Sequence, residues 1–222
     1  MSSGPHIALA ATSLVPRHRA RVAEAFVFNA SAWSAATGDE LACAPKMDGE
    51  VFSVVLNQSA HAFDRFVDLS ERLWPMPLRA ALVSVGHHSG ETAMQRARSK
   101  AVETLTLAGK ENVRFRVQLS GRGEHECRLA ETSLLLHAVI SEGWTSTRHQ
   151  AVRAYRELGR QKDVAEKLEV TQQAVSQMLR GARLRELRGV EDSLRSWFAE
   201  PTKPGLWPLK NLTLDNPAVA GV

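Results

Sequence analysis

The segment 160–179 constrains the fold more than any other part of the chain, because its pattern fits two short helices joined by a tight turn. Val164, Ala165 and Leu168 recur at helical spacing and give the first helix one apolar side. The small Ala165 allows a second helix to approach closely. Val170 follows in the turn, where we expect it to fill the space between the two helices.

The second helix is predicted over Thr171 to Ala182. Thr171 is a good N-cap, since its hydroxyl can accept a hydrogen bond from a free backbone amide of the first turn. Val175, Met178 and Leu179 then face inward at positions i, i+3 and i+4. The whole segment therefore predicts a helix-turn-helix.

The outward side chains of this segment are hydrogen-bond formers and cations, and no acidic residue occurs from Thr171 to Arg185. Gln pairs bidentately with adenine, and the first turns of a recognition helix enter the major groove. We therefore predict a DNA-binding surface, with arginines on phosphates. An ordinary two-helix corner with a solvated polar face is the structural alternative. The predicted DNA-binding residues are Thr171, Gln172, Gln173, Ser176, Gln177, Arg180, Arg183, Arg185, Arg160 and Lys162.

Composition permits this function without establishing it. The 222 residues are 44% apolar and 23% charged, with a formal charge of +4. This is globular composition with a mildly basic balance. Cys43 and Cys127 stand far apart, which argues against a disulfide scaffold or a cysteine-rich zinc site. The first residues lack a basic signal region and the longest apolar run is broken by His137, so we expect a cytoplasmic protein without a membrane segment.

Before residue 120 the chain alternates between strand-like and helix-like stretches. Asp48-Gly49, between two apolar runs, is a strong hairpin signal. The order predicts an α+β sandwich, with helices on one face of a mainly antiparallel sheet. Strands are expected at 7–11, 41–44, 51–56, 78–85 and 113–119, and helices at 17–28, 60–73 and 92–107.

After the predicted linker Ser120 to Glu124, only helices are expected, at 129–140, 147–158, 161–168, 171–182 and 190–198. Prolines and glycines interrupt the pattern from Pro201 onward. We therefore predict three parts: an α+β domain over 1–120, an all-α helix-turn-helix domain over 121–200 and a flexible tail over 201–222.

The chain resembles the SatD family of bacterial proteins over about residues 6 to 198. The resemblance rests on the first strand and basic helix (Ile7 to Arg21), the hairpin Gly49 to Leu56, the strand Leu78 to Leu82 and the helix Ala93 to Arg98. It implies a ferredoxin-like or palm-like N-terminal domain followed by a helix-turn-helix. The helix-turn-helix itself resembles the sigma-factor region that reads the −35 element.

The hairpin departs from the family's Gly-Asp-Glu-Phe pattern, which looks like the metal-binding turn of nucleotidyl cyclases. Glu50 and Val51 stand at the two acidic positions, and the first strand carries Ala10-Ala11-Thr12 where the family tends to have Gly-Asp. A two-metal site needs carboxylates on both strands. We therefore expect no enzyme activity, metal or cofactor. Gly38 to Leu41 also looks like the tetrapeptide, but it lies too far from the next helix and strand.

Three histidine-containing groups are candidate ligand sites. His87-His88 follow a predicted central strand, and His125-Glu126-Cys127 lies at the predicted linker. Neither supplies the three or four convergent ligands that a metal needs. His137 on an apolar helix is expected to be a core or interface histidine.

These features predict a sequence-specific transcriptional regulator that binds double-stranded DNA as a homodimer, since one small helix-turn-helix makes too few contacts for high specificity. The helix 129–140 is unusually apolar and could serve the dimer or the helical core equally well. Two alternatives remain: a nucleotide-handling enzyme related to cyclase palm domains with an accessory DNA-binding domain, and an RNA polymerase accessory protein. A small-molecule or nucleotide effector is compatible with the first reading.

Overall fold

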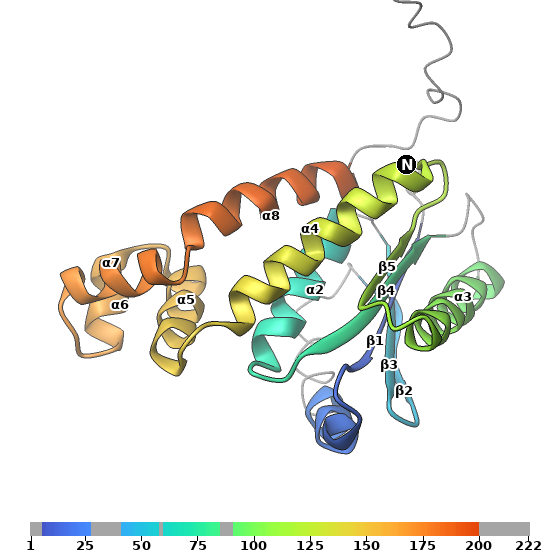
Figure 1. The fold of residues 1–222 in the computed structure, drawn as a ribbon, viewed down its shortest axis with the longest axis horizontal. Helices are drawn as coiled ribbons and strands as arrows, with labels where there is room; N and C mark the ends of the chain where they lie inside the picture. The colour runs from blue at the N-terminus through green and yellow to red at the C-terminus, as the bar shows by residue number, and fades with distance from the viewer. Residues whose placement is uncertain (1–5, 28–40, 58–59, 85–90, 200–222) are drawn as a thin grey trace, which may run out of the picture.

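The computed structural model describes residues 6–27, 41–57, 60–84 and 91–199, and joins a five-stranded sheet to a group of helices (Figure 1). The strand order is β2-β3-β1-β4-β5. The pairings β2–β3, β3–β1 and β1–β4 are antiparallel, and β4–β5 is parallel. The expected mainly antiparallel sheet is confirmed. The strands are β1 (Ile7–Ser13), β2 (Leu41–Asp48), β3 (Val51–Leu56), β4 (Leu78–Ser84) and β5 (Phe115–Gln118).

The helices follow the predicted order closely. A short 3-10 turn η1 (Pro16–His18) continues into a helix over 19–27. The later helices are α2 (Ala60–Arg72), α3 (Glu91–Lys110), α4 (Glu124–Glu142), α5 (Ser146–Leu158), α6 (Gln161–Lys167), α7 (Gln172–Gly181) and α8 (Leu184–Ala199). The chain is thus of mixed α and β structure, as predicted. No helix in the described ranges combines the length and apolarity that crossing a bilayer requires.

The predicted hairpin forms between β2 and β3. Asp48 pairs with Val51, so Gly49 and Glu50 make a two-residue turn. Gly49 has φ +58°, a value that glycine adopts without steric cost. β2 runs to Asp48 and is longer than the predicted strand, because Lys46 and Met47 still pair with β3.

Helices cover both faces of the sheet, which corrects the prediction of a single covered face. Ile7, Leu9 and Ala11 of β1 face a core shared with α2, whereas Ala8 and Ala10 face α3. All residues of β1 and β4 are buried, and a strand buried on both faces needs a layer on each side. Sequence alternation did not reveal this, because the alanines that face α3 are too small to stand out.

The outer edge of β5 lies against α4. The backbone N–H of Val117 donates to Glu131 Oε1 at 2.9 Å, and Arg116 Nη1 lies 3.2 Å from Glu131 Oε2. A carboxylate of α4 thus satisfies an amide that an edge strand would otherwise present to solvent. Residues of α4 and α8 also enter the apolar core of the sheet; they are Ala130, Leu134, Ala138, Leu194 and Phe198.

The segment predicted as a linker is packed on both sides. Ser120 donates its backbone N–H to Ser84 Oγ at 2.8 Å. Arg122 donates to the Trp197 carbonyl at 2.5 Å and stacks its guanidinium 4.9 Å from the Trp197 ring centre. The boundary at residue 120 stays a prediction, but the chain on either side of it builds one core.

A second apolar core holds α5, α6 and α7 against the start of α8. Trp144, Val152, Val164, Val175 and Leu187 are among its buried members. α8 begins at Leu184 rather than at the predicted Val190, because Leu184 and Leu187 are buried in this core. Three predictions fall outside the described residues: the Gly38-Asp39-Glu40 motif, His87-His88 and the tail 201–222.

Candidate nucleic-acid interface

The helix-turn-helix consists of α6, a four-residue turn and α7. The Leu168 N–H bonds to the Val164 carbonyl at 2.9 Å, and the Val170 N–H bonds to the Ala165 carbonyl at 3.0 Å. Glu169 between them has φ +56°, the left-handed conformation that reverses the chain at a helix end. The prediction of two helices joined by a tight turn is confirmed.

Val170 does not fill the space between the helices, contrary to the prediction. Its side chain is 37% exposed, whereas Leu168 packs against the second core. The left-handed Glu169 turns the chain before Val170, so Leu168, the C-cap of α6, supplies the apolar contact instead. The prediction placed the apolar residue of the turn between the helices, whereas it lies at the surface.

The start and the inner face of α7 are as predicted. Thr171 Oγ1 accepts from the Ala174 N–H at 3.1 Å, which makes Thr171 the N-cap. Val175 is fully buried, Leu179 is 7% exposed, and Met178 is partly buried against the same core. These contacts fix which face of α7 points into the protein, so the opposite face points to solvent.

That opposite face carries the predicted base-reading residues. Gln173, Gln177 and Arg180 are exposed at spacings of four and three, so they lie on one side of α7. Gln172 is exposed in the first turn and Ser176 is half-buried beside the stripe. Three amides or cations capable of directional hydrogen bonds thus line one solvent-facing side of the helix.

The predicted phosphate-binding residues surround α7. Arg183, in the connection to α8, is exposed and has φ +55°. Arg185 is exposed in the first turn of α8. Arg160 is the exposed N-cap of α6, and Lys162 in its first turn lies 4.0 Å from Glu166. The exposed ion pair of Lys162 is weak and would not prevent contact with a phosphate.

Sequence reasoning missed Arg148 of α5. Its guanidinium packs against Gly181: a Cβ added at this glycine would lie only 2.9–3.2 Å from the guanidinium atoms. α5 and the end of α7 therefore approach closely at this point. Arg148 therefore adds a cation beside Arg180 at the C-terminal end of α7. The signal was an isolated glycine inside a helical pattern, which often marks close packing.

Two tryptophans tie this unit to the rest of the molecule. Trp144 Nε1 donates to the Ala182 carbonyl at 2.9 Å and so holds the end of α7. Trp74, after α2, stacks on His149 of α5 with 4.5 Å between ring centres. His149 Nε2 lies 2.9 Å from the Glu71 carbonyl, and burial lowers the pKa of this histidine. His149 is thus neutral near pH 7 and donates to that carbonyl.

A buried ionic cluster lies where α2, α4, α5 and α8 meet. Arg156 bonds to both carboxylate oxygens of Glu191 at 2.9 and 2.5 Å, and His137 Nε2 lies 2.9 Å from Glu191 Oε1. Arg156 Nε is also 2.8 Å from Glu71 Oε1, an ion contact without hydrogen-bond alignment. His137, predicted as a core or interface histidine, is 3% exposed, which confirms the prediction.

The two carboxylates of this cluster have opposite pKa shifts. Burial raises the pKa of Glu191, but hydrogen bonds from Arg156 and His137 outweigh it and lower the pKa to about 2. Burial raises the pKa of Glu71, and the lowering by Arg156 does not offset it. Glu191 is therefore the permanently charged partner that holds Arg156 in place.

The hairpin that resembles a cyclase metal turn is engaged within the protein. Arg19 Nη1 lies 3.5 Å from Glu50 Oε2, and Thr12 Oγ1 donates to the Glu50 carbonyl at 2.9 Å. Within the described ranges, no three His, Cys, Asp or Glu side chains gather as a metal site would need. The Glu50 carboxylate thus lies beside one cation of its own chain and stays about half exposed.

Neither protein-family models nor curated proteins give a match to this chain. The resemblance to the SatD family therefore stays a proposal, and the functional argument rests on the geometry of α7 and its surroundings.

Proposed function

We propose that the chain is a sequence-specific DNA-binding transcriptional regulator, with α7 as its recognition helix. The observation that carries the proposal is the exposed face of α7, where Gln173, Gln177 and Arg180 lie opposite the buried Val175 and Leu179. Amide groups in the first turns of such a helix match the hydrogen-bond pattern of base edges in the major groove, and a guanidinium near its end can reach a phosphate.

The charge around α7 supports this proposal over a merely solvated helix corner. The described helix carries no acidic residue, and Arg148, Arg180 and Arg183 lie at its C-terminal end. The N-terminal ends of both α6 and α7 face outward with exposed caps, Arg160 and Thr171. Helix N-termini and arginines are the groups that bind DNA phosphates.

The test is selection of duplexes from a random DNA library by the purified full-length chain. The expected result is an enriched motif that the double variant Gln173→Ala/Gln177→Ala no longer enriches. Gln150→Ala, an exposed glutamine of α5, is the matched control and should enrich the same motif as the wild type. Absence of any motif, or an identical motif from the double variant, would refute the proposal.

For the N-terminal part, we propose a ferredoxin-like or palm-like core related to the SatD family, without enzyme activity. The support is connectivity: β1, the helix over 19–27, β2, β3, α2 and β4 follow one another, and the four strands lie in the order β2-β3-β1-β4. Both helices share the core on one face of these strands. Val51 and Ala10-Ala11-Thr12 stand where a two-metal site would need carboxylates, so a sensory or dimerising role fits better than a two-metal reaction.

For the assembly, we propose a homodimer formed through α4 in the cytoplasm. Leu129, Leu136 and Val139 are 57–69% exposed along one side of α4, and Leu135 is 41% exposed beside them. Leu134 and His137 on the opposite side are buried, so α4 serves the core and still presents an apolar stripe. RNA polymerase is the remaining candidate partner for this stripe, and copurification with polymerase would favour it.

A further inference from the structure

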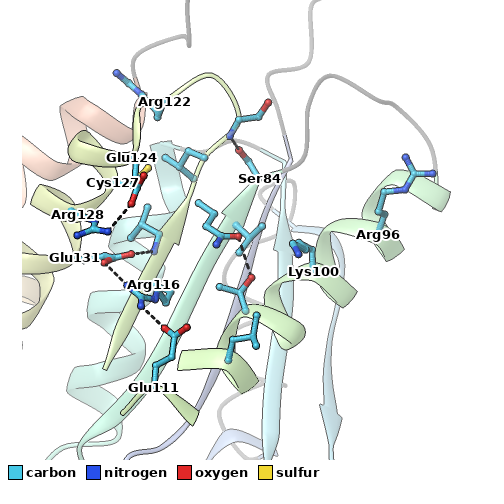
Figure 2. Close-up of a pocket in the computed structure, with 17 residues that line it drawn as sticks. Ser84, Arg96, Lys100, Glu111, Arg116, Arg122, Glu124, Cys127, Arg128 and Glu131 are labelled. Atoms are coloured by element: carbon cyan, nitrogen blue, oxygen red, sulfur yellow. Dashed lines mark hydrogen bonds and ion pairs between the residues drawn. The ribbon is translucent and has the colours of Figure 1, made fainter. Parts of the chain in front are cut away.

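A cavity of about 810 Å³ lies over β5, between α3 and α4, and no proposal above uses it (Figure 2). Its floor includes the ends of the parallel strands β4 and β5, at Ser84 and Gln118. The carboxyl ends of parallel strands are frequent ligand sites, and this volume suits a small organic molecule.

The α3 wall is polar at one end and apolar in the middle. Arg96, Lys100, Thr104, Leu107 and Glu111 follow one another at spacings of three and four, so they form one stripe along α3. The two cations come first, nearest the N-terminus of α3. Leu107 is 44% exposed and faces the cavity with its apolar side chain.

The apolar part of the cavity continues across the sheet and onto α4. Val117, Leu119 and Cys127 also line it, but they are only 2–7% exposed and pack into the core that the sheet shares with α2. Burial raises the pKa of the Cys127 thiol, so this side chain is neutral and behaves as an apolar surface. An aromatic or aliphatic body of a ligand would therefore find its main exposed apolar contact at Leu107.

The acidic side chains of the cavity are paired with other lining residues. Glu111 and Glu131 both bind Arg116, at 2.5 and 3.2 Å, and Glu124 binds Arg128 at 2.6 Å. Figure 2 shows these pairs along the α4 side and at the Glu111 end, away from Arg96.

The two cations of α3 that line the cavity, Arg96 and Lys100, have no carboxylate partner among the other lining residues. Arg96 makes no ion pair with any residue in the described ranges, and Lys100 pairs only with the exposed Glu103 outside the cavity. The lining therefore has five basic and three acidic residues, with the excess charge at the Arg96 end.

We propose that this cavity binds a small organic anion with an apolar body, its acidic group near Arg96 and Lys100 and its body against the exposed side chain of Leu107. Carboxylates, sulfonates and phosphates all provide the acceptor oxygens that these two cations need. The site does not depend on DNA binding, and it can be tested on the protein alone.

The probe is 8-anilinonaphthalene-1-sulfonate, an aromatic anion whose fluorescence rises in apolar surroundings. The wild-type chain should bind it saturably at one site. Arg96→Gln/Lys100→Gln should lower the affinity about tenfold or more, as expected for the loss of charge-assisted contacts. Arg21→Gln/Lys110→Gln removes the same charge from exposed positions outside the cavity and should leave the affinity unchanged.

Two further measurements separate this cavity from other apolar surfaces. The uncharged analogue N-phenyl-1-naphthylamine should bind wild type and Arg96→Gln/Lys100→Gln equally, because it lacks the sulfonate. Leu136→Glu, on the exposed stripe of α4, should leave sulfonate binding intact. No saturable binding, or binding that Leu136→Glu abolishes and the α3 double variant does not change, would overturn the proposal.

Discussion

At the scale of single residues, the proposed DNA binding assigns two chemical roles by position along α7. Gln173 and Gln177 lie in the first two turns on the exposed face, where side chains of a recognition helix reach base edges. Arg180 and Arg183 follow towards the end of the helix, where the DNA backbone lies. Amides select a base by paired donors and acceptors, whereas a guanidinium on a phosphate adds affinity without selecting a sequence.

Replacing Gln173 or Gln177 with Ala should cost about 1–3 kcal/mol of binding free energy on the selected site and little on random DNA. Each truncation removes a bidentate contact to a base but leaves the charge unchanged. Fluorescence anisotropy on both duplexes at one salt concentration measures the difference. Equal losses on the two duplexes would mean that α7 is not the base-reading element.

A substitution at Arg183 must be compatible with the left-handed backbone conformation of this residue. Because φ is +55°, Arg183→Gly removes the cation without adding strain, whereas Ala would confound charge with conformation. Arg183→Gly should weaken specific and random DNA alike, and lower the slope of log affinity against log salt by about 0.9. Lys110→Gln, on the distant helix α3, serves as the charge control. An unchanged slope would remove Arg183 from the phosphate-binding set.

At the scale of elements, signals that act within a few residues were predictable. The Asp48-Gly49 turn and the Thr171 cap each depend on one local hydrogen-bonding or φ preference, and both formed as expected. Val170 was mispredicted because the left-handed Glu169 before it turns it towards solvent. The two covered faces of the sheet were mispredicted because burial there depends on elements distant in sequence. The cluster around Arg156 could not be foreseen for the same reason: its members come from four helices.

The two sides of α4 should respond differently to substitution. Leu136→Glu should weaken self-association with little change in the unfolding temperature, because this side chain is 59% exposed in one copy of the chain. Leu134→Ala, at a fully buried position, should instead cost about 2–5 kcal/mol of stability. Sedimentation and thermal unfolding distinguish the two effects. A wild-type chain that stays monomeric at micromolar concentration, with and without DNA, would contradict the dimer.

At the scale of the whole molecule, the ionic cluster joins α2, which packs on the sheet, to helices α5 and α8 of the second core. Glu71 belongs to α2 beside the sheet, Arg156 to α5 and Glu191 to α8. Removal of one partner from a buried cluster leaves an uncompensated charge, which makes such clusters sensitive to protonation.

The Glu191 pKa predicts how this junction responds to acid. Its folded value of about 2 lies below the ordinary value of 4.5, so its contribution is complete above pH 4.5 and is lost as the pH falls towards 2. This difference corresponds to stabilisation on the order of 3 kcal/mol. Urea unfolding of wild type and Glu191→Gln should therefore show a stability gap that narrows between pH 5 and pH 3. If the stability difference between wild type and Glu191→Gln does not change with pH in this window, the loss in the variant is due to packing and not to the Glu191 charge.

The contact between α4 and the edge of β5 also bears on how such a chain can arise and diversify. The helix that shields the strand edge lies on the other side of residue 120 from the sheet, together with part of the apolar core. A recombination event that cut near this point would give one product a bare strand edge and the other an exposed core face. We therefore expect the helix-turn-helix to be inherited with its sheet, and under the proposed function new DNA specificities should arise by substitution on the surface of α7 rather than by exchange of whole segments.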